Sequence, residues 1–195
     1  MSITEQQLEQ VKKNCREVFE KKLHDYGVSW RLLRPSSVTD QIFIKANRIR
    51  SIETKGEVKI KEGIREEFMG IVNYGIIGLI QLSMFPALSP DISVEEALRL
   101  YDKNIDGSIA LLLNKNHDYD EAWRSMRISS YTDLILVKIL RVKQIENLHG
   151  ETLISEGIEA NYMDMINYSL FGLIRIDFPN ADTIHFKELA KGKAQ

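Results

Sequence analysis

The sequence has little of several features that would mark a specialised class of protein. Its single cysteine, Cys15, excludes an internal disulfide framework and is typical of a chain that folds in a reducing compartment. The formal net charge of −2 gives no strong basic field that would recruit duplex DNA. The first residues, MSITEQQLEQVKK, lack the apolar core of a signal peptide. We therefore expect a cytoplasmic protein that binds neither duplex DNA nor a membrane.

The common catalytic motifs are also missing from the sequence. It contains no G-x-S-x-G nucleophile elbow, no Walker A loop, no Rossmann glycine pattern and no C-x-x-C. His24 and His117 have no second His or Cys at ligand spacing, so we interpret them as local hydrogen-bonding residues rather than zinc ligands. Any chemistry has to come from other side chains.

Long hydrophobic runs are few, and polar residues interrupt the two that occur. Residues 68–85, FMGIVNYGIIGLIQLSMF, approach the length of a membrane span but contain Asn73 and Gln81. A related run, YMDMINYSLFGLIRI, contains Asp164 and Arg175, and charges at such depths of a bilayer are costly. Apolar residues make up 44% of the chain and charged residues 28%, as in ordinary globular proteins. We predict that both runs are buried helices of a soluble bundle.

The feature that the sequence does contain is an internal duplication. Residues 24–55 align without gaps on residues 117–148, with 15 of 32 positions identical. After one extra residue near position 149, residues 56–82 align on residues 150–176, with 12 of 27 identical. The predicted organisation is a single domain over 1–195, with repeats at 1–84 and 93–177, a linker at 85–92 and a polar tail at 178–195.

Each repeat has the pattern of three helices. The first helices are expected at about 4–23 and 94–115, the latter with Ser93 as N-cap, and the third helices at about 62–82 and 156–176. The second helices are expected to begin at S-x-x-D capping boxes, formed by Ser37 with Asp40 and by Ser130 with Asp133.

Three helices cannot cover their own apolar faces, so the two repeats should pack together about a pseudo-twofold axis. Gly78 and Gly172 recur in the third helices and indicate close approach of a neighbouring helix. We predict an all-α fold in which six main helices, as two pseudo-symmetric three-helix repeats, form one helical bundle. The oligomeric state stays open, a homodimer included.

Cations occur where the second helices should be buried. Lys138 and Arg141 lie three residues apart in TDLILVKILRVKQI, and Lys45 and Arg48 are their counterparts in the first repeat. An unpaired buried cation costs several kcal/mol, so these side chains need anionic partners from the protein or from a ligand. Asn73 and Asn167 are polar residues in the same position of the third helices, and we consider them candidates to orient a ligand.

Acidic residues line one stripe of each third helix. The stripe contains Glu156 and Glu159, with Asp164 at its edge, in the second repeat, and Glu62 and Glu66 in the first. Such carboxylates are ligands for Mg²⁺, which also keeps substrate phosphates in its shell. Two simpler interpretations remain open: acids in a first helical turn complement the helix dipole, and they form an internal ion network with the buried cations.

The pattern HDYxxxWRxxR occurs in both repeats. Its aromatic and guanidinium groups suit a flat heterocycle and its phosphates. The alternative is that the tryptophan anchors the chain at the start of the second helix and that the arginines lie on the surface. The residues concerned are Tyr26, Trp30 and Arg31, and Tyr119, Trp123 and Arg124.

KNHDYDEAW, LILVKILRVKQI and SEGIEANYMDMINYSLFGLI together resemble the nucleotide-modification-associated domain family. The resemblance covers residues 26–173, because the unit occurs twice. The first copy departs from it, with Arg65 in place of Glu159 and Gly70 in place of Asp164. The resemblance implies a link to nucleotide or modified-base metabolism. In helical layout the family is also similar to the all-α nucleotide pyrophosphohydrolases, whose acid pairs hold Mg²⁺.

These observations favour a Mg²⁺-dependent hydrolase of a nucleoside triphosphate or a related heterocycle triphosphate, such as a pterin. Glu156, Glu159 and Asp164 or Glu62 would hold the metal, and Lys138 would neutralise phosphate charge with Arg141 and Arg124. The alternative is a non-catalytic nucleotide-binding or accessory module. In a third, purely structural interpretation, the ion network only stabilises the core.

Overall fold

The computed structural model describes residues 1–56, 63–119, 121–148 and 156–179, and for residues 117–119 it describes the backbone alone. The described residues form six α-helices and two short 3₁₀ helices, without a strand, which confirms the predicted all-α fold. Most of the predicted tail lies outside them. The helices are α1 (Ile3–Tyr26), α2 (Pro35–Lys55), α3 (Ile64–Met84), α4 (Val94–Tyr119), α5 (Ile128–Asn147) and α6 (Ile158–Asp177).

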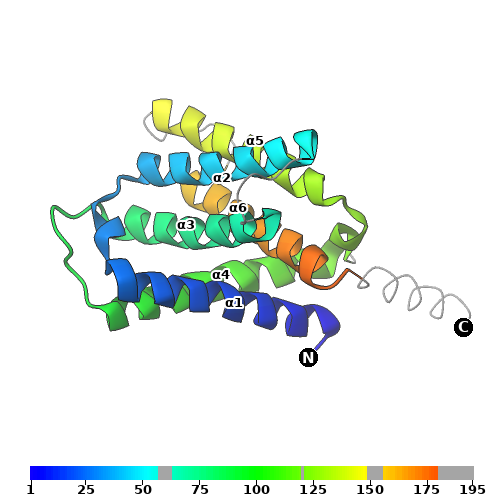
Figure 1. Cartoon of the computed structure of the whole chain (residues 1–195), viewed down its shortest axis with the longest axis horizontal. Coiled ribbons are helices and arrows are strands. Elements are labelled where there is room, and N and C mark those ends of the chain that lie inside the picture. Colours follow the sequence, from blue (N-terminus) through cyan, green and yellow to red (C-terminus); the bar gives the residue numbers. More distant parts are fainter. Residues whose placement is uncertain (57–62, 120, 149–155, 180–195) are drawn as a thin grey trace, which may run out of the picture.

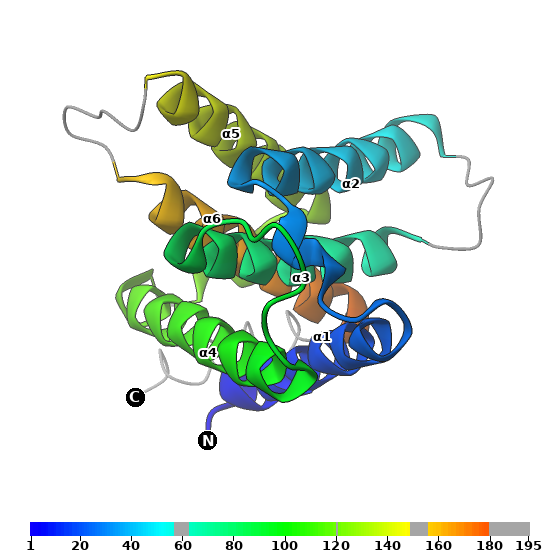
Figure 2. The ribbon, with the colours of Figure 1, turned by 90° about the vertical axis from the view of Figure 1, so that its left-hand side faces the viewer.

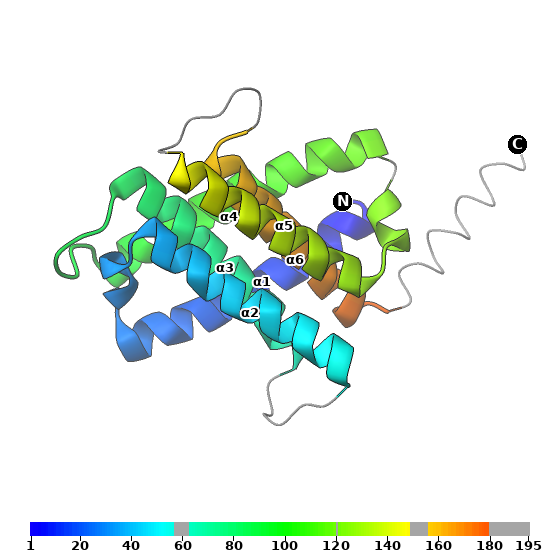
Figure 3. The same ribbon diagram turned by 90° about the horizontal axis from the view of Figure 1, so that it is seen from above.

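The helices lie in three layers of two (Figure 1), and each layer contains equivalent helices from the two repeats. The most apolar pair, α3 and α6, forms the middle layer, with α2 and α5 on one side and α1 and α4 on the other, as the end-on view shows (Figure 2). Seen from above (Figure 3), α2 and α5 cover the middle layer. The first helix of each repeat packs on the third helix of the other, α1 on α6 and α4 on α3.

Glycines allow α3 and α6 to approach closely at the centre of the bundle. A Cβ atom on Gly78 would overlap the ring of Tyr162, and one on Gly172 would lie 3.1 Å from Cζ of Phe68. Phe68 and Tyr162 occupy equivalent repeat positions, so the two contacts are related by the pseudo-twofold axis. The predicted close approach is confirmed.

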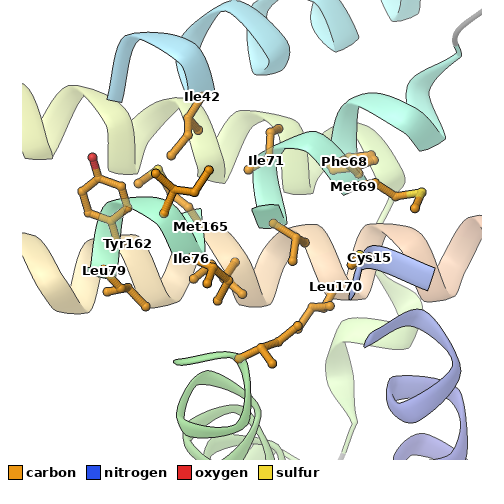
Figure 4. Close-up of a cluster of buried hydrophobic side chains, with 14 of the residues drawn as sticks. Cys15, Ile42, Phe68, Met69, Ile71, Ile76, Leu79, Tyr162, Met165 and Leu170 are labelled. Atoms are coloured by element: carbon orange, nitrogen blue, oxygen red, sulfur yellow. The ribbon is translucent and has the colours of Figure 1, made fainter. Parts of the chain in front are cut away.

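One continuous core runs through all three layers. Ile42, Phe68 and Tyr162, from α2, α3 and α6, are fully buried in it together with Cys15 of α1 (Figure 4). Burial raises the pKa of the Cys15 thiol to about 12, as for an unreactive core cysteine. Of the described helices α3 alone is long and apolar enough to cross a membrane, and 72% of that apolar window is buried inside the bundle.

The start of one helix agrees with the sequence-based prediction, and the starts of two others differ from it. Ser93 caps α4 as predicted, with its Oγ accepting from the backbone N–H of Glu96 at 3.2 Å. The predicted capping boxes of the second helices are wrong, because α2 begins at Pro35 and α5 at Ile128, and neither start has a side-chain cap. Ser37 therefore lies inside the first turn of α2, where proline at the first position already presets the helical φ.

Candidate functional site

Two 3₁₀ helices, η1 (Ser29–Leu32) and η2 (Ala122–Ser125), hold the Trp-Arg pairs of the repeated motif. In η1 the buried guanidinium of Arg31 donates to Asp91 of the linker, with Nε–Oδ1 and Nη2–Oδ2 distances of 2.8 and 3.1 Å. These bonds hold the pKa of Asp91 below its usual value. Arg31 also donates to Gln81 of α3, so it ties the linker to η1 and α3.

Arg124 of η2 is equally buried and has a different set of internal partners. It pairs with Glu121 and donates to Thr4 Oγ1 at 2.6 Å and Gln7 Oε1 at 3.0 Å, both on α1. Its guanidinium also lies over the ring of Trp123, 4.3 Å from the ring centre. A ligand-binding role for Arg31 or Arg124 remains a prediction.

In the first repeat, Lys45 and Arg48 of α2 share one carboxylate, that of Glu67 on α3. Lys45 Nζ lies 3.3 Å from Glu67 Oε2, and Arg48 Nη1 pairs with Glu67 Oε1. The Glu67 side chain is 4% exposed, whereas those of Lys45 and Arg48 are 22% and 25% exposed. The cations of this helix thus have the anionic partner that their burial requires. We call these three residues the first-repeat triad.

In the second repeat, the carboxylate of Asp164 on α6 binds two lysines from different helices. Its Oδ2 lies 2.7 Å from Lys138 Nζ of α5, and its Oδ1 lies 3.0 Å from Lys115 Nζ of α4. Burial alone would lower the pKa of Lys115, but the hydrogen bond to Asp164 and the nearby charges outweigh burial, so the pKa is raised. The charge of Glu156 contributes to this rise. We call Lys115, Lys138 and Asp164 the second-repeat triad.

The two triads use carboxylates from different repeat positions. Asn161 stands in α6 where Glu67 stands in α3, and its Nδ2 donates to the carbonyl of Gly157 at 2.8 Å. Conversely, Gly70 stands in α3 where Asp164 stands in α6. Each repeat therefore supplies one carboxylate to its cations, from positions about one helical turn apart.

A cavity of about 280 Å³ lies in the first repeat, between the end of α1, η1 and α3, and we call it the first-repeat pocket. Lys22 of α1 and Gly70 of α3 line it. Lys45 borders it, since Lys45 Nζ lies 5.9 Å from the ring centre of Tyr74 in the pocket wall. Four aromatic side chains form much of the wall: Phe19, Tyr26, Trp30 and Tyr74.

Two sequence differences between the repeats account for the first-repeat pocket. In the second repeat, Phe171 stacks on Trp123 with ring centres 4.3 Å apart. The smaller Ile77 stands at the position of Phe171 in the first repeat and lines the pocket. Gly70, which replaces Asp164, lines it as well. Smaller side chains at both positions thus open the first-repeat pocket beside Trp30.

The two repeated asparagines have different surroundings. Asn73 lines the first-repeat pocket and is fixed, because its Nδ2 donates to the carbonyl of Cys15 at 3.1 Å and its Oδ1 accepts from the Tyr101 hydroxyl at 2.8 Å. Asn167 is buried, and its Oδ1 has no hydrogen-bond partner among the described residues. Leu8 of α1 stands at the position equivalent to Tyr101 of α4, so Asn167 has no counterpart of the Tyr101 hydroxyl that donates to Asn73.

The acidic residues predicted to hold Mg²⁺ do not gather in the described part of the chain. Glu66 accepts from a backbone N–H at the start of α3, and Glu156 and Glu159 are exposed at the start of α6. Glu62 lies outside the described residues, and both oxygens of Asp164 bind lysines. Within the described ranges no three His, Cys, Asp or Glu side chains form a metal site. Mg²⁺ therefore stays a prediction without a gathered ligand set.

Sequence reasoning located part of this arrangement and missed part of it. Tyr26, Trp30 and Asn73 line the pocket, and their binding roles stay predictions, whereas the side chain of Tyr119 lies outside the described ones. Arg141 is half-buried, one turn after Lys138. Sequence reasoning missed three residues. Extending the repeat alignment by two residues upstream would have aligned Lys22 with Lys115. The predicted acidic stripe contained Glu66 instead of its neighbour Glu67.

Comparison with known proteins connects the chain with one family. The model of the family described as nucleotide modification associated domain 1 matches residues 22–82 and 115–176, once per repeat and over more than half of the chain. These two stretches contain both triads and nearly the whole lining of the first-repeat pocket. No curated protein and no solved structure matches the chain.

Proposed function

Because the chain belongs to the nucleotide modification associated domain 1 family, we propose that it binds a nucleotide, or a related phosphorylated heterocycle such as a pterin, in the first-repeat pocket. The observation that carries this proposal is a cavity with aromatic walls and lysines beside it. Flat heterocycles stack on aromatic faces, and phosphate groups pair with ammonium groups.

The size of the pocket and the exposure of its wall suit such a ligand. A cavity of about 280 Å³ is close to the lower bound of roughly 300 Å³ for small-molecule sites. Trp30 is deeply buried, whereas Tyr26 is 72% exposed, so the wall extends from the core to the surface. A heterocycle would lie against Trp30 and Tyr74, with its charged part toward the solvent side, where Lys22 is exposed.

The test is direct binding of adenosine, guanosine, cytidine, uridine and thymidine and their 5′-triphosphates, measured by isothermal titration calorimetry with and without Mg²⁺. At least one nucleotide should bind the wild-type chain. Tyr74→Leu should weaken that binding about tenfold or more, since stacking on an aromatic side chain contributes about 1–3 kcal/mol per base. The second-repeat counterpart, Tyr168→Leu, should weaken it far less.

Two outcomes would overturn this proposal. One is the absence of measurable binding by any nucleotide in the set, with circular dichroism showing a folded chain. The other is a larger loss of affinity in Tyr168→Leu than in Tyr74→Leu, which would transfer the site to the second repeat. A half-buried tyrosine on each of two equivalent helices makes the pair a matched comparison.

A second candidate function is Mg²⁺-dependent hydrolysis of a triphosphate at the second-repeat triad, whose residues do not line the first-repeat pocket. The observation in its favour is the pair of lysines, Lys115 and Lys138, on the Asp164 carboxylate, with the charge of Glu156 contributing to the raised pKa of Lys115. These cations would neutralise charge on the transferred phosphate, and a metal, when bound, would activate water.

Hydrolysis is tested by measuring release of phosphate and pyrophosphate from each 5′-triphosphate with Mg²⁺ or Mn²⁺. If the second candidate holds, Glu156→Gln should abolish release while calorimetry still detects nucleotide binding. Binding without release in the wild-type chain would leave the non-catalytic module as the function. Wild-type rates in Glu156→Gln would remove this mechanism.

A further inference from the structure

The two repeats place different groups at one point of the fold. In the second repeat the carboxylate of Asp164 lies between Lys115 Nζ and Lys138 Nζ, 3.0 and 2.7 Å away. In the first repeat this position is Gly70, which has no side chain. The lysines recur, however: Lys22 stands where Lys115 does, and Lys45 where Lys138 does. The first repeat thus keeps both cations and lacks the carboxylate between them.

One lysine of the first repeat lies over Gly70, and the other lines the same pocket as Gly70. A Cβ atom on Gly70 would lie 2.9 Å from Lys45 Nζ and 2.6 Å from its Cε, so this lysine lies directly over the glycine. Lys22 and Gly70 line the same first-repeat pocket. Lys22 is exposed, and among the described residues it forms no ion pair.

The lysines around this point would attract an anion. The ammonium groups of Lys22 and Lys45 carry one positive charge each. Glu67 also pairs with Arg48, so the buried carboxylate would retain a partner if Lys45 turned toward a ligand. A dianionic group at the mouth of the pocket would compensate the two ammonium charges.

We propose that a phosphate group of the bound nucleotide displaces Lys45 from its place over Gly70 and lies between Lys22 and Lys45, at the position equivalent to that of the Asp164 carboxylate in the second repeat. The proposal rests on nucleotide binding in the first-repeat pocket. The ammonium groups donate to phosphate oxygens, as Lys115 and Lys138 donate to carboxylate oxygens. A side chain at position 70 would enter the space that Lys45 now occupies, since a Cβ atom there would meet Cδ, Cε and Nζ of this lysine.

The experiment compares the affinity of the full chain for each nucleoside with its affinity for the 5′-triphosphate. The nucleoside affinity measures binding in the pocket, and the difference between the two affinities measures the contribution of the phosphate groups. In the wild-type chain the triphosphate should bind at least about tenfold more tightly than the nucleoside, the factor expected of one charge-assisted hydrogen bond. Lys22→Met should remove most of that difference without changing nucleoside affinity. Lys21→Met, an exposed neighbour on α1, should leave both affinities unchanged.

A second pair of variants separates charge from volume. Gly70→Asp and Gly70→Asn add side chains of nearly equal size, so they should affect nucleoside affinity equally. Gly70→Asp should weaken triphosphate binding about tenfold more than Gly70→Asn, because its carboxylate would pair with both lysines as Asp164 does.

The outcomes distinguish this inference from the function on which it rests. If neither nucleosides nor nucleotides bind, nucleotide binding itself is refuted. If triphosphates bind but Lys22→Met lowers nucleoside and triphosphate affinity alike, or Gly70→Asp and Gly70→Asn weaken triphosphate binding equally, the phosphate lies elsewhere. The nucleotide-binding function would then stand without this phosphate position.

Discussion

At the scale of single residues, the repeated cations of the second helices show how a bundle accommodates charge in an apolar helix. Lys45 and Lys138 extend from equivalent positions, and each reaches a carboxylate that is at most one-tenth exposed. The carboxylates come from Glu67 and Asp164, about one helical turn apart in repeat position. Each repeat has therefore met the same electrostatic requirement with a different residue.

Glu67→Gln should destabilise the chain by about 2 kcal/mol, because removing one member of a buried ion pair leaves its partners without compensation. The expected value stays below the full range for deeply buried pairs, since Lys45 and Arg48 keep about a quarter of their side-chain surface in contact with water. Urea denaturation at pH 7 measures the change in the free energy of unfolding.

Glu66→Gln is the control for this substitution. Glu66 is exposed and accepts from a backbone N–H at the start of α3, a bond that glutamine keeps. Its free energy of unfolding should therefore change by less than about 0.5 kcal/mol. Equal losses of unfolding free energy in the two variants would mean that the buried ion pairs of Glu67 stabilise the chain no more than the exposed carboxylate of Glu66 does.

The sequence predicted the need for such partners but not their identity. The periodicity of an apolar helix shows that Lys138 is mostly buried, and burial requires an anion. Which carboxylate reaches it depends on how α4, α5 and α6 pack, and Lys115 comes from a helix about twenty residues upstream. Likewise, the hydrogen bonds of Arg31 to Asp91 and Gln81 join segments 50 to 60 residues apart, beyond the range of any local pattern.

At the scale of helices, the crossing of α3 and α6 determines how tightly the bundle closes. Gly78→Ala should destabilise the chain by about 2 kcal/mol or more, because the new methyl group would overlap the Tyr162 ring in a packed core. Gly172→Ala should be nearly neutral, since its Cβ would lie 3.1 Å from Phe68 and the gain in helix propensity offsets the crowding. Thermal unfolding followed by circular dichroism ranks the two.

Gly107→Ala calibrates that comparison. Gly107 lies exposed within α4, and nothing lies within 4 Å of a Cβ atom built there. Alanine should therefore stabilise this helix by about 0.5–1 kcal/mol. The expected order of stability is Gly107→Ala, then Gly172→Ala, then Gly78→Ala, and a Gly78→Ala chain as stable as Gly107→Ala would contradict the close packing of α3 on α6.

Two carboxyl groups in the layer of α2 and α5 should make the free energy of unfolding depend on pH. Burial raises the pKa of Glu53 on α2 and of Glu146 on α5, two equivalent repeat positions. A carboxyl group with a raised folded-state pKa adds stability below its unfolded pKa of about 4.3, and this contribution is lost as pH rises through the folded value. Replacing both with glutamine should thus raise the free energy of unfolding at pH 7 by roughly a few tenths of a kcal/mol.

This effect should disappear in acid. At about pH 3.5 both carboxyl groups are mostly protonated in the folded and unfolded chain, so the double variant and the wild type should unfold at similar urea concentrations. Glu17→Gln, at an exposed position on α1, should behave like the wild type at both pH values. A double variant that is less stable than the wild type at pH 7 would show that ionised Glu53 and Glu146 stabilise the layer.

Sequence reasoning predicted the helices well and their starts less well. The third helices were recognisable because their apolar runs carry a repeated glycine, which the contacts of Gly78 and Gly172 explain. The start of α2 was misplaced because an S-x-x-D pattern at Ser37 looks like a capping box. Pro35 two residues earlier begins the helix instead, and Arg34 takes the N-cap position without a side-chain bond.

At the scale of the whole molecule, the two repeats keep one architecture and differ where a ligand would bind. Ile77 and Phe171 occupy equivalent positions beside Trp30 and Trp123. The aromatic side chain of Phe171 stacks on its tryptophan, whereas Ile77 lines an open pocket. After duplication, one repeat can thus fill this position with its own side chain while the other repeat keeps a pocket for a ligand.

Ile77→Phe should convert the first repeat to the filled arrangement. The new ring would enter the first-repeat pocket and stack on Trp30, as Phe171 stacks on Trp123. Filling a cavity commonly stabilises a protein by about 0.5–2 kcal/mol, so the melting temperature should stay level or rise. Nucleotide affinity, measured by calorimetry, should fall at least about tenfold, because the heterocycle loses its stacking surface.

Phe171→Ile is the reciprocal change and distinguishes loss of space from loss of stability. It removes the stacked ring from Trp123, so it should cost about 1–3 kcal/mol of stability while leaving nucleotide affinity in the first repeat unchanged. Affinity would then fall only in the variant that keeps its stability, which general destabilisation cannot produce. Full nucleotide affinity in a folded Ile77→Phe chain would mean that the heterocycle binds outside the pocket beside Trp30.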